Sequence, residues 1–489
     1  MRRPVHRWEL GLSLDESDGT PLSRRIARAI MDEVRRGRLM PGARLPGSRS
    51  LAHVLHVHRN TVIAAYEQLA GEGWTEPLRA RGTFIARSVP RMPRRTSRAT
   101  THIHAKPLQV RFDVPADTKL DVKRGRTGLR SLSDGVPDVR LAPVAALTRA
   151  YRRVLRQDPQ DLLAYGHPQG HPRLRTALGE MLRSRRGLMA EADDVLVTSG
   201  SQMALELVAR ALLRPGDTVA VEALGYRPAW TVFRQHGAAL APLPLDACGL
   251  DVTALEALCE RSAPRAVYVT PHHQYPTTVT LTAPRRIALL ELARRKRFAI
   301  IEDDYDHEYH YEGRPVLPMA SADGAGVVLY VGSLAKVLAP GVRLGYLVAP
   351  RPLLALVTAL RASIDRQGDH ALECAVADLL ERGELQRHAQ RARRIYGARR
   401  DALTQALGRE LGTELAFVTP SGGMTVWAAV ADGLDVEAWA DRLRADGLML
   451  YTGRRYAYDG KVRGNVRLAF APFDEQELAQ WVRLLRKAL

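Results

Sequence analysis

The feature that most constrains the fold is an alternation of short apolar runs with helical segments, which begins near residue 131. Helical patterns separate most of five strand-like runs: DVLVTSG, DTVAVEA, RAVYVTP, FAIIED and VVLYVGS. This order predicts an α/β fold with a parallel sheet covered by helices. After about residue 365, amphipathic helical segments and two short strands follow, GGMTVWAAV and GNVRLAF. We therefore expect a large domain over residues 131–365 and a small α/β subdomain over residues 366–489.

The whole chain excludes several classes of protein. Its 489 residues are too many for one ordinary core, so the protein is expected to be multidomain. No apolar run is long enough to span a membrane, and the N-terminal stretch lacks the apolar core of a signal peptide. The three cysteines fit neither a disulfide framework nor a zinc site. These features favour a cytoplasmic protein.

The net charge of +19 is concentrated in the first quarter of the chain. Residues 1–130 hold 26 of the 72 Lys and Arg but only 12 of the 53 Asp and Glu. The remaining residues are close to neutral, so the N-terminal part is expected to bind a polyanion. An arginine-rich composition throughout is the alternative, but it leaves the asymmetry unexplained.

Residues 14–86 have the pattern of a small DNA-binding domain. Four apolar residues at four-residue steps form the stripe of a first helix: Leu22, Ile26, Ile30 and Val34. A second helix begins at a capping-type Ser48, a third covers HRNTVIAAYEQLAGEG, and WTEPLRARGTFIA predicts two strands around Arg81-Gly82. Three helices and a hairpin are the plan of a winged helix-turn-helix. Residues 87–130 are basic with little periodicity and predict a flexible linker.

The first turn of the third helix carries side chains suited to reading DNA: His58, Arg59, Asn60 and Thr61. Arg pairs with guanine, Asn pairs with adenine, and Thr can bind a phosphate. Arg49 is placed for a backbone phosphate, and Gly82 lets the wing tip approach the DNA closely. The stretch from GRLMPGARLPGSRS to RGTFIA resembles the DNA-binding domain of GntR-type regulators, although Gly47 and His58 depart from the usual serine or threonine. A protein-interaction module is the alternative.

In the second part, Lys336 lies among small and apolar neighbours in VGSLAKVLAPGVRLGY. A buried lysine is costly unless something uses it, and its amine can form a Schiff base with an aldehyde such as pyridoxal phosphate (PLP). That cofactor also needs a carboxylate near its pyridine nitrogen and a donor to its ring oxygen. In FAIIEDDYDHEY, Asp303 is the candidate carboxylate and Tyr305 the candidate donor. A solvated loop or a metal site at His307 and His310 is the alternative, but we expect no metal.

The cofactor phosphate needs a cradle of N–H groups, hydroxyls and positive charge, which a helix N-terminus supplies. Ser201 and Gln202 follow Gly200 at the start of a helix, and Ser333 and Arg343 flank Lys336. Tyr226, after another strand, is the candidate ring to pack against the cofactor.

Together these motifs resemble the fold-type I PLP enzymes, the aspartate aminotransferase superfamily, over roughly residues 131–489. The resemblance implies that Tyr165 reaches the phosphate of a partner subunit and that Arg467 binds a substrate carboxylate. In HHQYPTTVTL, Tyr275 replaces the asparagine of the family's Asn-Pro-Thr-Gly segment and Thr278 replaces its glycine. The Ser-x-x-Lys of penicillin-binding enzymes lacks its companion tripeptides here.

The combination of both parts resembles the MocR family of transcriptional regulators. The resemblance implies a head-to-tail homodimer that binds operator DNA and senses PLP or an amino compound through an aldimine at Lys336. Two alternatives stay open: a working aminotransferase that regulates its own synthesis, and a DNA-binding protein with a cofactor-free domain.

Overall fold

The computed structural model describes residues 20–78, 81–88, 130–313 and 316–489. Its contacts divide the chain into two units, Met1–Asp121 and Val122–Leu489. The predicted linker over residues 87–130 lies almost wholly outside the described residues. None of the described helices is both long and apolar enough to cross a membrane.

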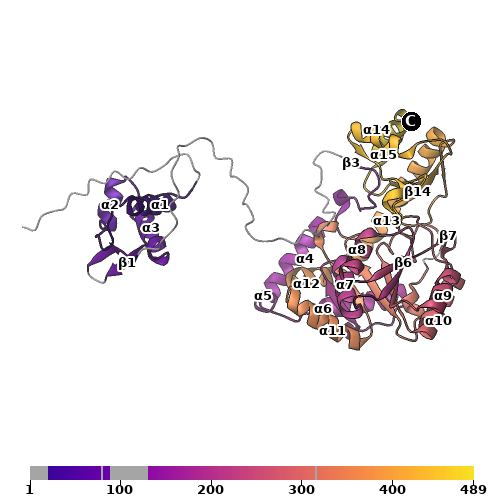
Figure 1. Ribbon diagram of the computed structural model, residues 1–489, viewed down its shortest axis with the longest axis horizontal. Helices are drawn as coiled ribbons and strands as arrows, with labels where there is room; N and C mark the ends of the chain where they lie inside the picture. Colours follow the sequence, from indigo (N-terminus) through magenta and orange to yellow (C-terminus); the bar gives the residue numbers. More distant parts are fainter. Residues whose placement is uncertain (1–19, 79–80, 89–129, 314–315) are drawn as a thin grey trace, which may run out of the picture. The chain divides into compact units, whose positions relative to one another are not determined.

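The described part of the first unit consists of three helices and a hairpin (Figure 1). α1 (Leu22–Arg35), α2 (Ser48–Val54) and α3 (Arg59–Gly71) precede the antiparallel strands β1 (Thr75–Leu78) and β2 (Gly82–Ile85). The middle of the predicted stripe, Ile26 and Ile30, is buried against Val62 and Leu69 of α3. The winged helix-turn-helix expected from the sequence is therefore confirmed.

Two predicted details at the helix starts are wrong. Gly47, not Ser48, takes the N-cap position of α2, and the Ser48 hydroxyl instead accepts a hydrogen bond from Arg59 Nε at 3.3 Å. His58 precedes α3 rather than forming its first turn. Its Nδ1 accepts from the backbone N–H of Asn60 at 3.2 Å, which satisfies a donor that the helix start leaves free.

The second unit is built on a seven-stranded sheet in the order β4-β12-β11-β10-β9-β5-β6. The strands are β4 (Val195–Thr198), β5 (Thr218–Glu222), β6 (Ala239–Leu243), β9 (Ala266–Val269), β10 (Ala299–Asp304), β11 (Val328–Ser333) and β12 (Gly345–Val348). β12, which was not among the predicted strands, runs antiparallel to both of its neighbours, so the sheet is mixed. The connection over residues 334–344 contains no crossover helix, which a parallel neighbour would require.

Helices cover both faces of the sheet. Successive residues of a strand point to opposite faces, so each strand contributes side chains to both layers of packing. Val219 and Val221 of β5 pack with α7 (Ser201–Leu212), α8 (Arg227–Gln235) and α11 (Arg351–Ile364). Ala220 between them packs with α9 (Val252–Arg261) and α10 (Ala283–Lys296). A further core joins Val195 and Val197 of β4 to α4 (Val144–Gln157), α6 (Pro172–Arg186) and α12 (His370–Glu381), with α5 (Pro159–Leu163) beside it.

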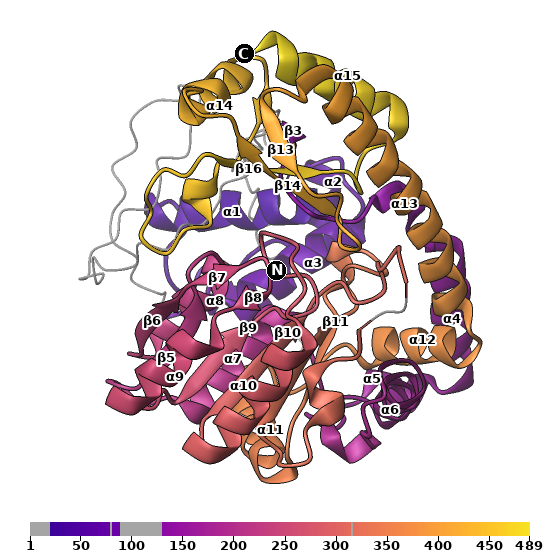
Figure 2. The same cartoon turned by 90° about the vertical axis from the view of Figure 1, so that its right-hand side faces the viewer.

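The small part contains an antiparallel sheet of β13 (Leu415–Phe417), β14 (Thr425–Val430) and β16 (Asn465–Ala469), with α14 (Val436–Ala445) and α15 (Glu475–Lys487). A short parallel pair joins β15 (Leu448–Met449) to β3 (Arg130–Ser131), which is the first described strand of the second unit in the sequence. Figure 2 shows α13 (Glu384–Leu411) running from the large part to the small part.

The predicted boundary at residue 365 stays a prediction, and the two hydrophobic cores of this unit do not divide there. Cys374 of α12 and Leu385 of α13 belong to the core of the large part. The later α13 residues, such as Leu403, belong to the core of the small part, and so does Leu132. An amphipathic pattern predicts a helix with an apolar face but does not say which of two cores that face meets.

Candidate cofactor pocket and nucleic-acid interface

A cavity of about 180 Å³ lies where β10 and β11 end. It is lined by eight of the residues predicted to serve the cofactor or the effector: Ser201, Tyr226, Asp303, Tyr305, Ser333, Lys336, Arg343 and Arg467. These residues come from distant parts of the sequence, and the sheet brings them together because the carboxyl ends of parallel strands meet at one edge.

Lys336 presents its amine to this cavity. Its Nζ donates a hydrogen bond to the carbonyl oxygen of Gly135 at 2.7 Å, and Tyr309 Oη donates to its backbone carbonyl at 2.8 Å. Enclosure, together with the positive charge of Arg467, lowers the pKa of Lys336 to about 8. The unprotonated amine, which is the form that attacks an aldehyde, is therefore much more populated at neutral pH than in an exposed lysine.

Asp303 is buried at the end of β10 with one oxygen committed and one free. Its Oδ2 accepts a hydrogen bond from Tyr268 Oη at 2.8 Å, whereas Oδ1 has no partner among the described protein groups. Burial, with a further contribution from Asp304 and Asp306, raises the pKa of Asp303 to about 7. A cationic donor in the cavity would satisfy Oδ1 and favour the ionised carboxylate.

Three aromatic rings and an arginine form another part of the wall. Tyr226 and Tyr275 meet edge to face with ring centroids 5.4 Å apart. The Arg467 guanidinium lies 4.4 Å from the ring centroid of Tyr275, and its Nη1 donates to the carbonyl of Ser133 at 3.0 Å. Tyr305 lines the cavity as predicted, but its hydroxyl donates to the carbonyl oxygen of His273 at 3.0 Å.

The N-terminus of α7 and Arg343 form a site suited to an anion. Gly200 has φ of +88° immediately before the helix, and Ser201 is its first residue. Arg343 Nη2 donates to the carbonyl of Ser199 at 2.8 Å, and a Cβ on Gly200 would lie only 3.0 Å from that nitrogen. The glycine thus lets the guanidinium approach the helix start, where backbone N–H groups attract a phosphate.

Two predicted residues do not line the cavity. Gln202 Nε2 donates to the carbonyl of Pro228 at 3.3 Å. Tyr165 is 79% exposed, with the Arg366 guanidinium 4.1 Å from its ring centroid. The contact of Tyr165 with a partner subunit stays a prediction.

Sequence reasoning missed several other residues of the wall: Gly135, Tyr268, Thr270 and Pro340. Tyr268 left a signal, because it is the only polar side chain in the apolar run AVYV (residues 266–269) and stands near the end of a predicted strand. Thr278, predicted to replace a glycine, has φ of +63°, a left-handed conformation that favours glycine.

A larger hollow, of about 700 Å³, lies between the start of α4 and α13. Its polar lining consists of arginines with one glutamate and one histidine: Arg140, Arg149, Arg387, Arg391, Glu384 and His388. It offers no lysine–carboxylate pair, so the chemistry of the smaller cavity identifies the candidate site.

The first unit presents the predicted DNA-reading residues to solvent. Arg49, His58, Arg59 and Asn60 are exposed, and Thr61 is half-buried. Gly82 begins the second wing strand with φ of +108°, and a Cβ there would lie 3.2 Å from Arg44 Nε. An exposed helix start with basic and amide side chains beside a wing is the arrangement that winged helices use in the major groove.

Family models match both parts of the chain. Residues 22–85 match the bacterial regulatory proteins of the gntR family, and residues 130–485 match aminotransferase class I and II.

Two curated relatives match almost end to end. The probable rhizopine catabolism regulatory protein MocR of Rhizobium meliloti is 30% identical over 98% of this chain and 95% of its own length. The HTH-type pyridoxine biosynthesis transcriptional regulator PdxR of Corynebacterium glutamicum is 32% identical over 97% of each chain.

Solved aminotransferase structures match the second unit. The alpha-aminoadipate aminotransferase LysN of Thermus thermophilus, complexed with N-(5'-phosphopyridoxyl)-L-leucine, is 30% identical with a TM-score of 0.69. The match covers 74% of this chain and 92% of that one. The kynurenine aminotransferase of Pyrococcus horikoshii is 29% identical with a TM-score of 0.70, over 74% and 91% of the two chains.

Proposed function

Because the chain belongs to the MocR family of transcriptional regulators, we propose that its DNA binding is controlled by PLP and an amino compound that meet at Lys336. The observation that carries this proposal is the cavity itself. It combines a lysine of lowered pKa with a buried carboxylate whose free oxygen lacks a partner, in a chain that also bears a winged helix-turn-helix.

The residues of the cavity fit the parts of PLP one by one. The cofactor supplies an aldehyde and an electron-withdrawing pyridine ring. Lys336 would bond the aldehyde, and Asp303 would hold a proton at the pyridine nitrogen through its free Oδ1. Ser201, Ser333 and Arg343 would bind the phosphate at the start of α7, and Tyr226 would pack against the ring.

Arg467 supports an amino acid or a related amino carboxylate as the effector. Its guanidinium faces the same cavity as Lys336, so a ligand could present an amine to one and a carboxylate to the other. For such a ligand to change transcription, it must favour one conformation of the protein over another. We expect a head-to-tail homodimer that binds operator DNA through two winged helices.

The experiment measures cofactor and DNA binding on the same full-length protein. PLP is added, the complex is reduced with borohydride, and mass spectrometry locates the modified residue, which should be Lys336. Fluorescence anisotropy then follows binding to the DNA upstream of the protein's own gene, with and without PLP and a panel of amino acids.

Wild-type protein should change its DNA affinity with at least one ligand, whereas Lys336→Ala should bind the same DNA without responding. DNA affinity that no ligand changes would refute the sensing role. Fast turnover of an amino donor and a keto acid would instead support the aminotransferase alternative. Light scattering tests the dimer.

A further inference from the structure

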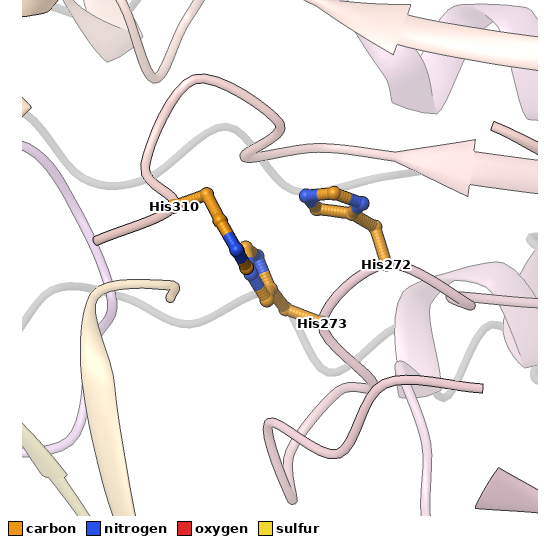
Figure 3. A group of neighbouring side chains, drawn as sticks. All are labelled: His272, His273 and His310. Carbon is orange, nitrogen blue, oxygen red and sulfur yellow. The ribbon is translucent and has the colours of Figure 1, made fainter. Parts of the chain in front are cut away.

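Four histidine side chains gather where the loop after β9 meets the loop after β10; we call them the histidine cluster. They are His272, His273, His307 and His310. The ring centroid of His272 lies 4.3 Å from that of His273, 4.6 Å from that of His307 and 6.0 Å from that of His310. Figure 3 shows His272 and His273 on one loop and His310 on another.

Most buried ring nitrogens of this cluster lack hydrogen-bond partners among the described residues. Both ring nitrogens of His272 are buried and unpartnered, and so are Nε2 of His273, Nδ1 of His307 and Nδ1 of His310. Buried polar atoms almost always have a partner, so five orphaned nitrogens at one place require an explanation. His388 shows the usual state, because its buried Nε2 is 2.9 Å from the carbonyl oxygen of Val337.

The geometry matches an open site for a transition-metal ion. One nitrogen each from His272, His273 and His310 lie within 4.8 Å of one another. Zinc–nitrogen bonds of about 2.0–2.1 Å place tetrahedral ligands roughly 3.4 Å apart. Ring rotations that draw the nitrogens together by about 1.5 Å would close the site around an ion.

The contacts of His273 suit a histidine that binds a metal ion. Its Nδ1 lies 2.8 Å from Asp306 Oδ1, which fixes the ring and leaves Nε2 as the coordinating atom. A Cβ on Gly422 would lie only 2.0 Å from that Nε2, so only a glycine at this position lets the imidazole ring pack so closely. His307 is not one of the three histidines whose nitrogens gather, and its Nδ1 lies 3.0 Å from Asp304 Oδ2.

We propose that His272, His273 and His310 bind one divalent transition-metal ion, with Zn²⁺ as the best match to three imidazole ligands. Three protein ligands leave a fourth position for water or another small ligand. The ion would link the loop that carries Tyr275 to the loop that carries Tyr305, and both tyrosines line the cofactor cavity. The proposal is independent of the regulatory function, because metal binding is measured directly.

The experiment uses untagged full-length protein, so that no added histidines compete. Protein treated with a chelator is titrated with Zn²⁺ by calorimetry, and bound metal is counted by plasma mass spectrometry. The test variants are His272→Gln and His310→Gln. The control is His236→Gln, a histidine that pairs with Glu206 away from the cluster. Circular dichroism and PLP uptake verify that each variant is folded.

Wild-type protein and His236→Gln should bind one Zn²⁺ per chain, whereas His272→Gln and His310→Gln should lose this site. Asp306→Asn should weaken binding by about 10–100-fold, as expected when a histidine ligand loses its orienting carboxylate. Mg²⁺, which prefers oxygen ligands, should not compete. Wild-type protein that takes up no Zn²⁺ overturns the proposal by itself, and so does an affinity unchanged in both folded test variants.

Discussion

Replacing Asp303 by Asn is expected to stabilise the cofactor-free protein while weakening its affinity for PLP. Burial raises the pKa of Asp303 from 3.8 to about 7, so the folded carboxyl keeps a proton that the unfolded chain has lost between these values. The free energy of unfolding therefore falls as the pH rises through this range. At roughly 1.4 kcal/mol per pH unit, the carboxyl costs about 4 kcal/mol at pH 8 and about 2 kcal/mol at pH 5.

Asn removes this titration but introduces an amide N–H where Oδ1 now has no partner. An unsatisfied buried donor costs about 1–3 kcal/mol, so the net gain should be about 1–3 kcal/mol at pH 8 and near zero at pH 5. Loss of a charge-assisted bond worth about 1.5–3 kcal/mol should weaken PLP binding by about 10–100-fold. Opposite signs for stability and affinity are typical of a residue kept for its function.

The assay is urea unfolding of cofactor-free protein at pH 5 and pH 8, with a PLP absorbance titration at pH 8. Asp246→Asn is the control, because Asp246 pairs with Arg285 outside the cavity and its pKa is lowered. Asp246 is ionised in both the folded and the unfolded chain at pH 5 and at pH 8. The change in the free energy of unfolding caused by Asp246→Asn should therefore be the same at the two pH values. The reasoning is refuted if Asp303→Asn gains no more stability at pH 8 than at pH 5, or binds PLP like the wild type.

Three further predictions concern the amine, the phosphate site and the DNA. The rate of covalent PLP capture should rise with pH to an inflection near 8, the lowered pKa of Lys336, because only the neutral amine reacts. The rate is measured by stopped-flow absorbance, and an inflection near the ordinary lysine pKa of 10.5 would contradict this prediction. Gly200→Ala, which strains a positive φ beside Arg343, should lose about 1–2 kcal/mol of stability and also PLP affinity. Gly433→Ala, at φ of +86° in open space, should lose only stability, and equal effects on PLP would argue against the phosphate site. Arg59→Ala should weaken operator binding by about 1–3 kcal/mol in anisotropy titrations, and an unchanged affinity would place base reading elsewhere.

The sequence revealed the parts of the site whose signals are local. Lys336, Asp303 and Arg343 stand at strand ends or beside helix starts, and the chemistry of PLP requires their residue types there. Gly135 could not be found in this way, because the fold alone brings its carbonyl to Lys336 from 201 residues away. The strand β12 was not predicted, and a strand pattern would not have shown that it runs antiparallel to its neighbours, because such patterns carry no information about strand direction.

The histidine cluster, like the contact of Gly135, could not be predicted from local signals in the sequence. His307 and His310 were visible as possible ligands within one segment of the sequence. His272 and His273 belong to another loop, and only the pairing of β9 with β10 brings the two loops together. Contacts between loops depend on strand order, which the sequence pattern predicts only as a class of fold.

The pairing of β3 with β15 fixes the start of the described second unit to its small part. Arg130 pairs with Leu448 of the small part. The segment that connects the winged helix-turn-helix to the second unit therefore ends on the small part. Arg467 also belongs to the small part, whereas Lys336 belongs to the large part. A ligand that draws Arg467 towards Lys336, as proposed above, would therefore also move β3, where the described part of the second unit begins.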